Sequence, residues 1–139
     1  MLETGIKGTG EVIVTEENTA KHMGSGTLEV FATPAMIALM ENTAYRSIAD
    51  ELETGYGTVG TRMDVRHVAA SPVGMKIKCE TELIQIKDRA LTFSVRAYDE
   101  AGLIGEGEHE RFIICEDRFL AKANAKKAYP HQSSQGRMR

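Results

Sequence analysis

The chain has 139 residues with a net charge of −3, and 42% of its residues are apolar while 27% are charged. This size and composition are typical of one soluble globular domain with a real core. The negative charge does not favour nucleic acid as a partner, no apolar run approaches the roughly 18 residues that span a membrane, and the polar start LETGIKGTGE is not a secretory signal.

Two cysteines, Cys79 and Cys115, are too few for a disulfide framework or for a four-ligand zinc site. Both occur in segments with strand-like alternation, and we interpret them as reduced residues of the core. Reduced cysteines favour a cytoplasmic location.

Positive charge is concentrated at the end of the chain. Residues 116–139 carry six Lys or Arg and two acidic residues, a net of +4, whereas the remainder has a net charge of −7. Such an end is either a local contact for a phosphate-bearing ligand or a solvated tail, and the sequence favours the tail.

The first part of the chain predicts a strand and a loop. In residues 5–15, GIKGTGEVIVT, the apolar side chains of Ile6, Val12 and Val14 share one face of a strand. Residues 16–29 are mostly polar or small, which indicates a loop.

Residues 30–52, VFATPAMIALMENTAYRSIADEL, predict one long helix. Thr33 suits the N-cap, and Pro34 suits the first helical position. Residues 35–40 are apolar on every face of this helix, so we expect the rest of the chain to wrap around it. Polar residues return from Arg46 onward, so the second half should reach the surface.

Four segments after the helix alternate with period two, namely residues 58–69, 75–86, 90–99 and 103–115. Short turns between them require antiparallel neighbours. A short amphipathic helix over 116–127 and a flexible tail over 128–139 complete the chain. We therefore predict an α+β fold, in which an antiparallel sheet of about five strands curls around one long helix in a single domain over residues 1–127.

The same alternation predicts which side chains share a face of each strand. In the first of the four segments they are Val59, Thr61, Met63, Val65 and His67. In the next two they are Met75, Ile77, Cys79, Thr81 and Leu83, followed by Leu91, Phe93, Val95 and Ala97. In the last segment they are Gly105, Gly107, His109 and Arg111, and the paired glycines indicate a close approach by another element, plausibly the long helix.

Thr33 and Glu41 are candidates for chemistry on the helix. The Thr33 hydroxyl is either the helix cap or, where a base activates it, a nucleophile or an orienting group. Glu41 follows the apolar run directly. Its carboxylate is either paired with a buried arginine or raised in pKa by desolvation, which would suit a general base near neutral pH.

Two histidines, His67 and His109, are candidates on the strands. A histidine on an apolar strand face is more often structural than functional, and we interpret His109 in that way. His67 has the same structural alternative, but its titration range makes it the best acid or base candidate in the chain.

Helix geometry separates Thr33 from Glu41. Eight residues correspond to about 12 Å of helical rise, at ~1.5 Å per residue, so the two side chains of one chain cannot hydrogen-bond to each other. Either a substrate spans both, or a two-fold-related copy brings its own residues across. The sequence contains no GxSxG elbow, P-loop, CxxC or GxGxxG after a strand.

Several motifs together resemble one known family, the fluoroacetyl-CoA thioesterase-like branch of the hotdog-fold thioesterases. They are FATPAMIALMEN at 31–42, GTVGTRMDVRHVAASPVG at 57–74, IGEGEHER at 104–111 and the final EDRFLAKANAK. The resemblance covers most of residues 5–126, and the spacings from Thr33 to Glu41 and from Glu41 to His67 match without a gap.

This resemblance implies roles for five residues. Thr33, Glu41 and His67 would form the catalytic triad, Gly60 would offer its backbone N–H to the thioester carbonyl or oxyanion, and Arg111 would be a supporting substrate-binding residue. It further implies an acyl-CoA substrate, homodimers with active sites near the dimer interface, and neither a metal nor a redox cofactor. The sequence leaves open whether these dimers pair further into tetramers.

The sequence departs from the family pattern in the segment before the helix. The fluoroacetyl-CoA enzyme has a longer, aromatic-rich stretch there that covers the acyl pocket, whereas this chain has HMGSGTLEVF, with small residues at 24–27. We expect a more open or differently shaped pocket for a short or medium acyl group.

Two other functions are considered beside hydrolysis. A non-catalytic acyl-CoA or small-ligand binding module could use the same fold, and saturable binding without turnover would identify it. A hydratase acting on an enoyl-CoA is disfavoured, because the expected D-x-N-P-x-H type of motif is absent.

Overall fold

The computed structural model describes residues 1–128 of the chain. Its strands are β1 (Lys7–Ile13), β2 (Tyr56–His67), β3 (Lys76–Lys87), β4 (Ala90–Asp99) and β5 (Gly102–Cys115). Its α-helices are α1 (Ala20–Met23), α2 (Thr33–Ile48) and α3 (Glu116–Asn124), and its 3₁₀ turns are η1 (Glu16–Asn18), η2 (Ala49–Glu51) and η3 (Ala125–Ala128).

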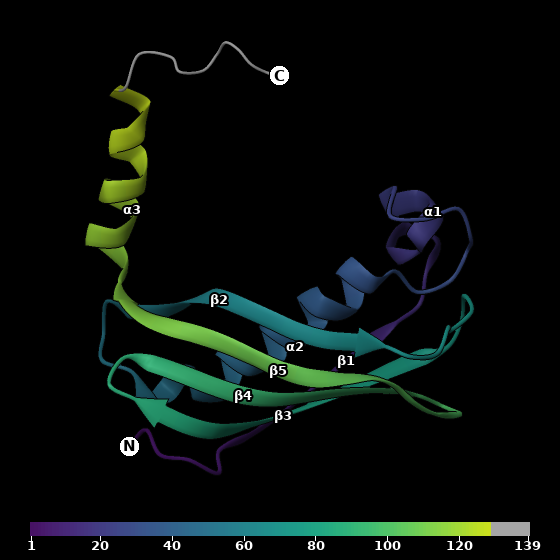
Figure 1. Ribbon diagram of the computed structural model, residues 1–139, viewed down its shortest axis with the longest axis horizontal. Helices are drawn as coiled ribbons and strands as arrows, with labels where there is room; N and C mark the ends of the chain where they lie inside the picture. The colour runs from purple at the N-terminus through teal and green to yellow at the C-terminus, as the bar shows by residue number, and fades with distance from the viewer. Residues whose placement is uncertain (129–139) are drawn as a thin grey trace.

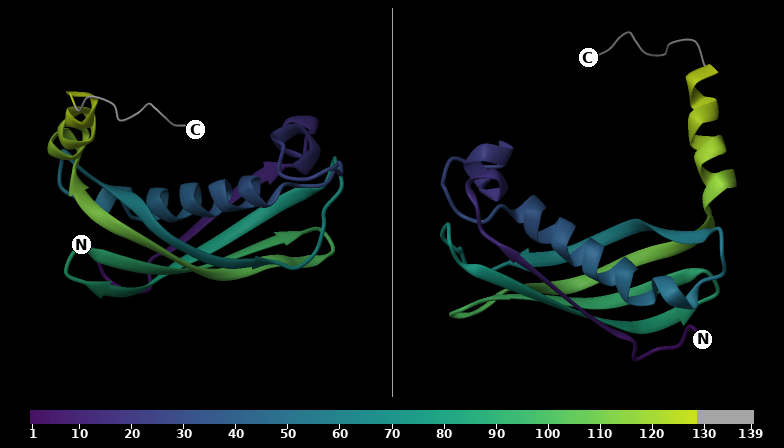
Figure 2. Two further views of the ribbon diagram at one scale, coloured as in Figure 1. Left: turned by 45° about the horizontal axis from the view of Figure 1, so that its top comes forward. Right: turned by 180° about the vertical axis from the view of Figure 1, so that it is seen from behind.

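The five strands form one antiparallel sheet in the order β1-β3-β4-β5-β2. The sheet curls around α2, which lies along its concave face (Figure 1, Figure 2). β3, β4 and β5 are joined by tight turns, whereas β1 and β2 are the two edges. This arrangement confirms the predicted α+β architecture.

The core lies between α2 and the inner face of the sheet. The inward residues predicted for 75–86 and 90–99 are buried there, except Met75, which precedes β3 and is half-buried against the core. The helix contributes Met36, Met40, Ala44 and Ile48. Phe93 is completely buried and is one of the largest side chains in this layer. Removing a side chain of this size from water stabilises a fold by about 1.5–3 kcal/mol, so this layer fixes α2 on the sheet.

The apolar pattern over residues 35–40 predicts a helix enclosed on all sides. The long helix is not enclosed in this way. Met36 and Met40 are fully buried, whereas Pro34 and Ala38 are exposed to solvent. The sheet covers only one side of α2, so the prediction of complete enclosure is wrong for a single chain. The helix also begins at Thr33 and changes to a 3₁₀ turn after Ile48, inside the predicted 30–52 range.

A β-bulge in β2 changes which side chains face the core. The pairing of β2 with β5 shifts register between Gly60 and Arg62. After the bulge, Met63 packs against the core as predicted. Before it, Gly60 faces α2, so the prediction that Val59 and Thr61 share a face with Met63 is wrong. One extra residue reverses the inside–outside alternation of a strand.

The predicted loop over residues 16–29 is partly helical, because it contains η1 and α1. Thr19 begins α1 by accepting a hydrogen bond from the backbone N–H of His22 at 3.2 Å. Phe31, which follows this segment, is almost fully buried and bonds through its backbone N–H to the carbonyl of Ser71. These contacts anchor the chain just before α2 begins.

The two cysteines are free thiols, but only one belongs to the core. Cys79 is fully buried, and this burial raises the pKa of its thiol to about 11. Cys115 is half-buried at the start of α3, so its interpretation as a core residue is wrong. Hydrogen bonds from Arg118 lower the pKa of the Cys115 thiol.

The C-terminal helix α3 stands away from the sheet, and all of its residues are exposed (Figure 1). Of the predicted flexible tail over 128–139, only Ala128 is described, as the last residue of η3. Residues 129–139 lie outside the described part of the chain. Within residues 1–128, no helix is long and apolar enough to cross a membrane.

Two glycines of β5 are sites of close approach, as the sequence predicted. A Cβ on Gly105 would lie 2.5 Å from the sulfur of Met36 on α2, which confirms the approach of the helix at this position. At Gly107 the neighbour is instead the β2 backbone, since a Cβ would collide with the carbonyl oxygen of Asp64 and the Cα of Val65.

We expect Gly107→Ala to lower the free energy of unfolding by about 2–3 kcal/mol, because backbone atoms of a paired strand cannot move aside cheaply. Chemical denaturation measures the change. Gly26→Ala is the matched control, since its new methyl group would meet only the Cβ of Ala20, at 3.3 Å. Equal stability of the two variants would contradict this account of the β2–β5 contact.

Candidate active site

Thr33 and His67 form a hydrogen-bonded pair where α2 begins and β2 ends. The Thr33 hydroxyl lies 2.8 Å from Nδ1 of His67. The N-cap of α2 is Ala32, so the alternative in which Thr33 caps the helix is wrong. As the first residue of the helix, Thr33 directs its hydroxyl to the histidine and makes no capping bond.

His67 has one ring nitrogen bonded to Thr33 and one without a partner. Its Nε2 is buried and makes no hydrogen bond within residues 1–128. The ring meets Phe31 edge-on, with 6.5 Å between ring centroids. Burial lowers the pKa of His67 below its ordinary value of 6.5, and a contact with the backbone of Ala69 opposes this effect in part. The imidazole is therefore neutral at pH 7 and can accept a proton.

A cleft of about 280 Å³ opens beside this pair. It is lined by Ala20, Ser25, Val30, Phe31, Thr33, His67, Val68, Ala69 and Ala70. Most of these side chains are small or apolar. A hydroxyl beside a neutral imidazole, at the N-terminus of a helix and on the rim of an apolar cleft, can support attack on a carbonyl and stabilise developing negative charge.

Arg111 is the centre of a second cluster, on the inner face of β5. Only 7% of its surface is exposed. Its Nε donates to the Thr58 hydroxyl at 2.7 Å, Nη2 donates to the Thr58 carbonyl at 3.0 Å, and Nη1 donates to Nε2 of His109 at 3.1 Å. The guanidinium also lies over the ring of Tyr45, 5.6 Å from its centroid, which is a cation–π distance.

His109 is fully buried and neutral. Arginine has only donors, so Nε2 of His109 must accept from Arg111, and Nδ1–H therefore donates to the carbonyl of Arg62 at 2.8 Å. Burial lowers the pKa of His109 below 6.5, and the charge of Arg111 acts in the same direction. These contacts agree with the structural interpretation of His109, which supports the Arg111 guanidinium.

Glu41 reaches this cluster across Gly60. A Cβ on Gly60 would lie 2.8 Å from Oε2 of Glu41 and 3.3 Å from Nη1 of Arg111. The space that this missing side chain leaves is therefore bordered by the carboxylate and the guanidinium. No ion pair within 4.0 Å joins Glu41 to Arg111, although the carboxylate partly offsets the lowering of the Arg111 pKa by burial.

The structure thus groups the predicted site residues in two places. It joins Thr33 to His67 by a hydrogen bond, and it places Glu41 beside Gly60 and Arg111. The groups are separated by the two turns of α2 between residues 33 and 41, a rise of about 12 Å.

The sequence analysis missed two supporting residues of the second cluster, Thr58 and Tyr45. Tyr45 is four residues after Glu41, so helical spacing alone would have placed the two on one face. Thr58 was hidden by the bulge in β2, which directs its side chain inward.

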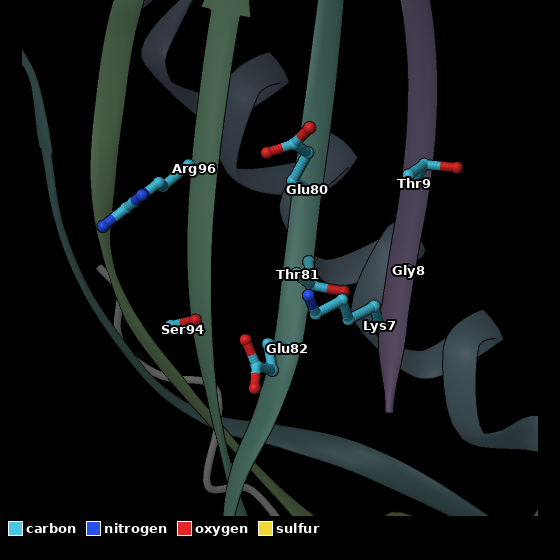
Figure 3. Close-up of a pocket in the computed structure, with 8 residues that line it drawn as sticks. All are labelled: Lys7, Gly8, Thr9, Glu80, Thr81, Glu82, Ser94 and Arg96. Carbon is cyan, nitrogen blue, oxygen red and sulfur yellow. The ribbon is translucent and has the colours of Figure 1, made fainter. Parts of the chain in front are cut away.

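A further hollow lies on the outer face of the sheet, between β1, β3 and β4 (Figure 3). Charged side chains of both signs surround it, including Lys7, Glu80, Glu82 and Arg96. The helix lies behind the sheet in this view, and none of the predicted site residues reaches the hollow. We therefore place the candidate active site on the concave face.

The sequence and the fold match one family throughout. The model of the fluoroacetyl-CoA-specific thioesterase family matches residues 14–117. The fluoroacetyl-CoA thioesterase of Streptantibioticus cattleyicolor is 35% identical over 131 residues, which are 90% of this chain and 94% of that protein.

Solved structures agree with this match. A structure of the fluoroacetyl-CoA thioesterase FlK has a TM-score of 0.86 and 35% identity, over 91% of this chain and 98% of that chain. A Thermus thermophilus protein of the thioesterase superfamily has a TM-score of 0.84 and 28% identity, over 91% of this chain and 94% of that chain. The hotdog fold implied by the sequence motifs is thereby confirmed.

The neutral state of His109 makes stability depend on pH. Below pH 6.5 the unfolded chain binds a proton at this residue while the folded chain resists it, so the free energy of unfolding falls as the pH falls. Where the unfolded chain binds one proton more than the folded chain, the free energy of unfolding changes by about 1.4 kcal/mol per pH unit. We expect His109→Gln, whose amide can donate to Arg62 and accept from Arg111, to flatten this slope.

Urea unfolding between pH 5 and pH 7.5 measures the slope for both proteins. His67 has a lowered pKa as well, so the slope of the variant should be reduced and not abolished. Identical slopes would show that His109 is not held neutral in the fold.

Proposed function

This chain belongs to the fluoroacetyl-CoA-specific thioesterase family of hotdog-fold enzymes, and we propose that it hydrolyses a short or medium acyl-CoA thioester to the free acid and CoA. The observation that carries this proposal is the Thr33–His67 pair on the rim of an apolar cleft. A nucleophile within hydrogen-bond reach of a base is the arrangement that acyl transfer requires.

In the proposed reaction, His67 accepts a proton as an oxygen attacks the thioester carbonyl. That oxygen belongs either to the Thr33 hydroxyl or to a water molecule that Thr33 orients. The carbon–sulfur bond then breaks, and the CoA thiolate leaves and takes up a proton. If Thr33 attacks, the acyl-threonine ester is hydrolysed in a second step. The low pKa of His67 keeps the base deprotonated at neutral pH.

Glu41 and Gly60 complete the proposed site. The Glu41 carboxylate would act as a general base or orient His67 or the attacking water, and the backbone N–H of Gly60 would stabilise the oxyanion. Support for these roles comes from the absence of a side chain at Gly60, which leaves space beside the Glu41 carboxylate for a substrate group. Arg111 would hold this part of the site in place through Thr58.

The acyl group is expected to be short or medium in length. The segment before α2 lines the cleft with the small residues Ala20 and Ser25. Phe31 is the aromatic residue of this segment that lines the cleft. Small side chains there leave the cleft open on one side. We propose a pocket that does not select for a fluorinated acyl group.

Release of free thiol from a panel of acyl-CoAs, from acetyl to long chain, tests the function. We expect turnover on short or medium members, and a loss of about 10²–10⁴-fold in His67→Ala and in Glu41→Gln, which is typical for a lost acid–base group. Thr33→Ala should cause a comparable loss if Thr33 is the nucleophile, and a smaller one if it orients water.

Full activity of Glu41→Gln would contradict the mechanism. Saturable acyl-CoA binding without thiol release by the wild-type protein would contradict the function, and it would favour the non-catalytic binding module. Circular dichroism of each variant checks that the fold is retained.

We also propose that the enzyme is a cytoplasmic homodimer joined along β2. Within the described chain, β2 has an unpaired edge, and the side of α2 that bears Pro34 and Ala38 is not covered by the sheet. Pairing of β2 with its two-fold copy would satisfy the free backbone groups of the edge. It would also bring a second set of site residues alongside the first. The two free thiols support the location.

Mixing two inactive variants distinguishes a shared site from a site within one chain. If Glu41 of one subunit serves the His67 of the other, a heterodimer of His67→Ala and Glu41→Gln contains one intact site. Random exchange would then restore about a quarter of the wild-type activity, because half of the dimers are mixed and each has one good site. No restoration, with exchange verified by mass spectrometry, would place the site within one chain.

A further inference from the structure

Within residues 1–128, nothing packs on the apolar side chains of helix α3. Phe119 is 45% exposed and Leu120 is 61% exposed, and these neighbouring side chains stand on a helix that leaves the body of the protein. The backbone N–H of Glu116 donates to the carbonyl of Gly55 at 3.0 Å, which fixes the start of α3 beside the start of β2.

The two ends of the free β2 edge are both flanked by projecting segments. In Figure 1 and in both views of Figure 2, α3 rises past this edge at one end, and α1 rises past it at the other. β2 has 12 residues, so these ends are about 40 Å apart at ~3.3 Å per residue. The two projections thus stand at opposite ends of the edge.

A two-fold copy paired along this edge would place α3 of one chain beside α1 of the other. When a strand pairs with its own antiparallel copy, the start of one strand lies opposite the end of the other. The Tyr56 end of β2, which lies beside the start of α3, therefore meets the His67 end of the partner. At that end, Val68 and the first residue of α1, Ala20, line the cleft next to Thr33.

The surfaces that would meet are chemically complementary. On the α1 side, Met23, Leu28 and Val68 are exposed by 45%, 66% and 57%. These match the exposed pair on α3. The segment 16–29 has a net charge of −2, with three glutamates and one lysine. The segment 116–128 has a net charge of +2, with four basic and two acidic residues.

We propose that α3 of each subunit docks across the dimer onto α1 and the cleft rim of its partner, with Phe119 and Leu120 against Met23, Leu28 and Val68. This inference rests on the proposed homodimer along β2. The docked helix forms the missing outer wall of the cleft that holds Thr33 and His67. Each active site is then closed by a residue pair from the other chain, and α3 takes the place of a long segment before α2.

A disulfide between positions 68 and 120 tests this docking. The variant Val68→Cys/Leu120→Cys is made in a Cys115→Ser background, and Cys79 is too buried to react. Within one chain the two positions lie at opposite ends of β2, so a 68–120 disulfide can form only between chains. We expect covalent dimers on a non-reducing gel after mild oxidation, formed at least tenfold faster than in the control.

The matched control is Ile13→Cys/Leu120→Cys in the same background. Ile13 is 45% exposed and Val68 is 57% exposed, so the two positions are similarly accessible. Ile13, however, lies on β1 at the opposite edge of the sheet. Cross-linking of the test variant no faster than this control, in protein that sedimentation shows to be dimeric, would overturn the docking. A monomeric wild-type protein would overturn it as well.

Thiol release by the wild-type protein keeps the two proposals separate. Cross-linking without wild-type turnover would leave the docked helix in place and remove the proposed function. Turnover without cross-linking would leave the function in place and overturn the inference about α3.

Charge reversal gives a second measurement of the same contact. Lys122→Glu/Lys126→Glu should slow the cross-linking of positions 68 and 120, and Glu17→Lys/Glu29→Lys in the same chain should restore its rate. An unchanged rate in the first of these variants would overturn the electrostatic part of the docking.

Discussion

The buried guanidinium of Arg111 is the group to which the surrounding structure is fitted. A charge with 7% exposure and no anion in direct contact must be compensated by hydrogen bonds and by nearby negative potential. Thr58 and His109 supply the acceptors, Tyr45 supplies a ring face, and Glu41 supplies the charge at a distance. The β2 bulge is part of this solution, because it directs Thr58 inward.

The same constraint bears on the two proposed site positions of α2, which cannot touch. Glu41 stays near the guanidinium in the middle of the helix, while Thr33 at its start pairs with the end of β2. The layer of apolar side chains under α2 holds the helix at one height over the sheet. Rigid elements on both sides therefore set the spacing of the candidate site residues.

The sequence predicted the fold well because its signals were local and repeated. Period-two alternation marked β3 and β4 with their core residues, and the paired glycines of β5 marked close approaches. Two errors near the candidate site came from single-residue events. One extra residue in β2 reversed the face of Thr61, and a helix start shifted by one residue released Thr33 from capping to bond His67. No periodic pattern records such events, and Thr58 was missed for the same reason.

The edge position of β2 links assembly to chemistry. This strand carries Gly60 in its interior and His67 at its end, and its other side is free to pair. Any partner that pairs along β2 must therefore come close to both clusters of the site, because the strand that binds it also positions their residues. An unpaired edge is normally a hazard for a soluble protein, and closing it with a second copy removes that hazard.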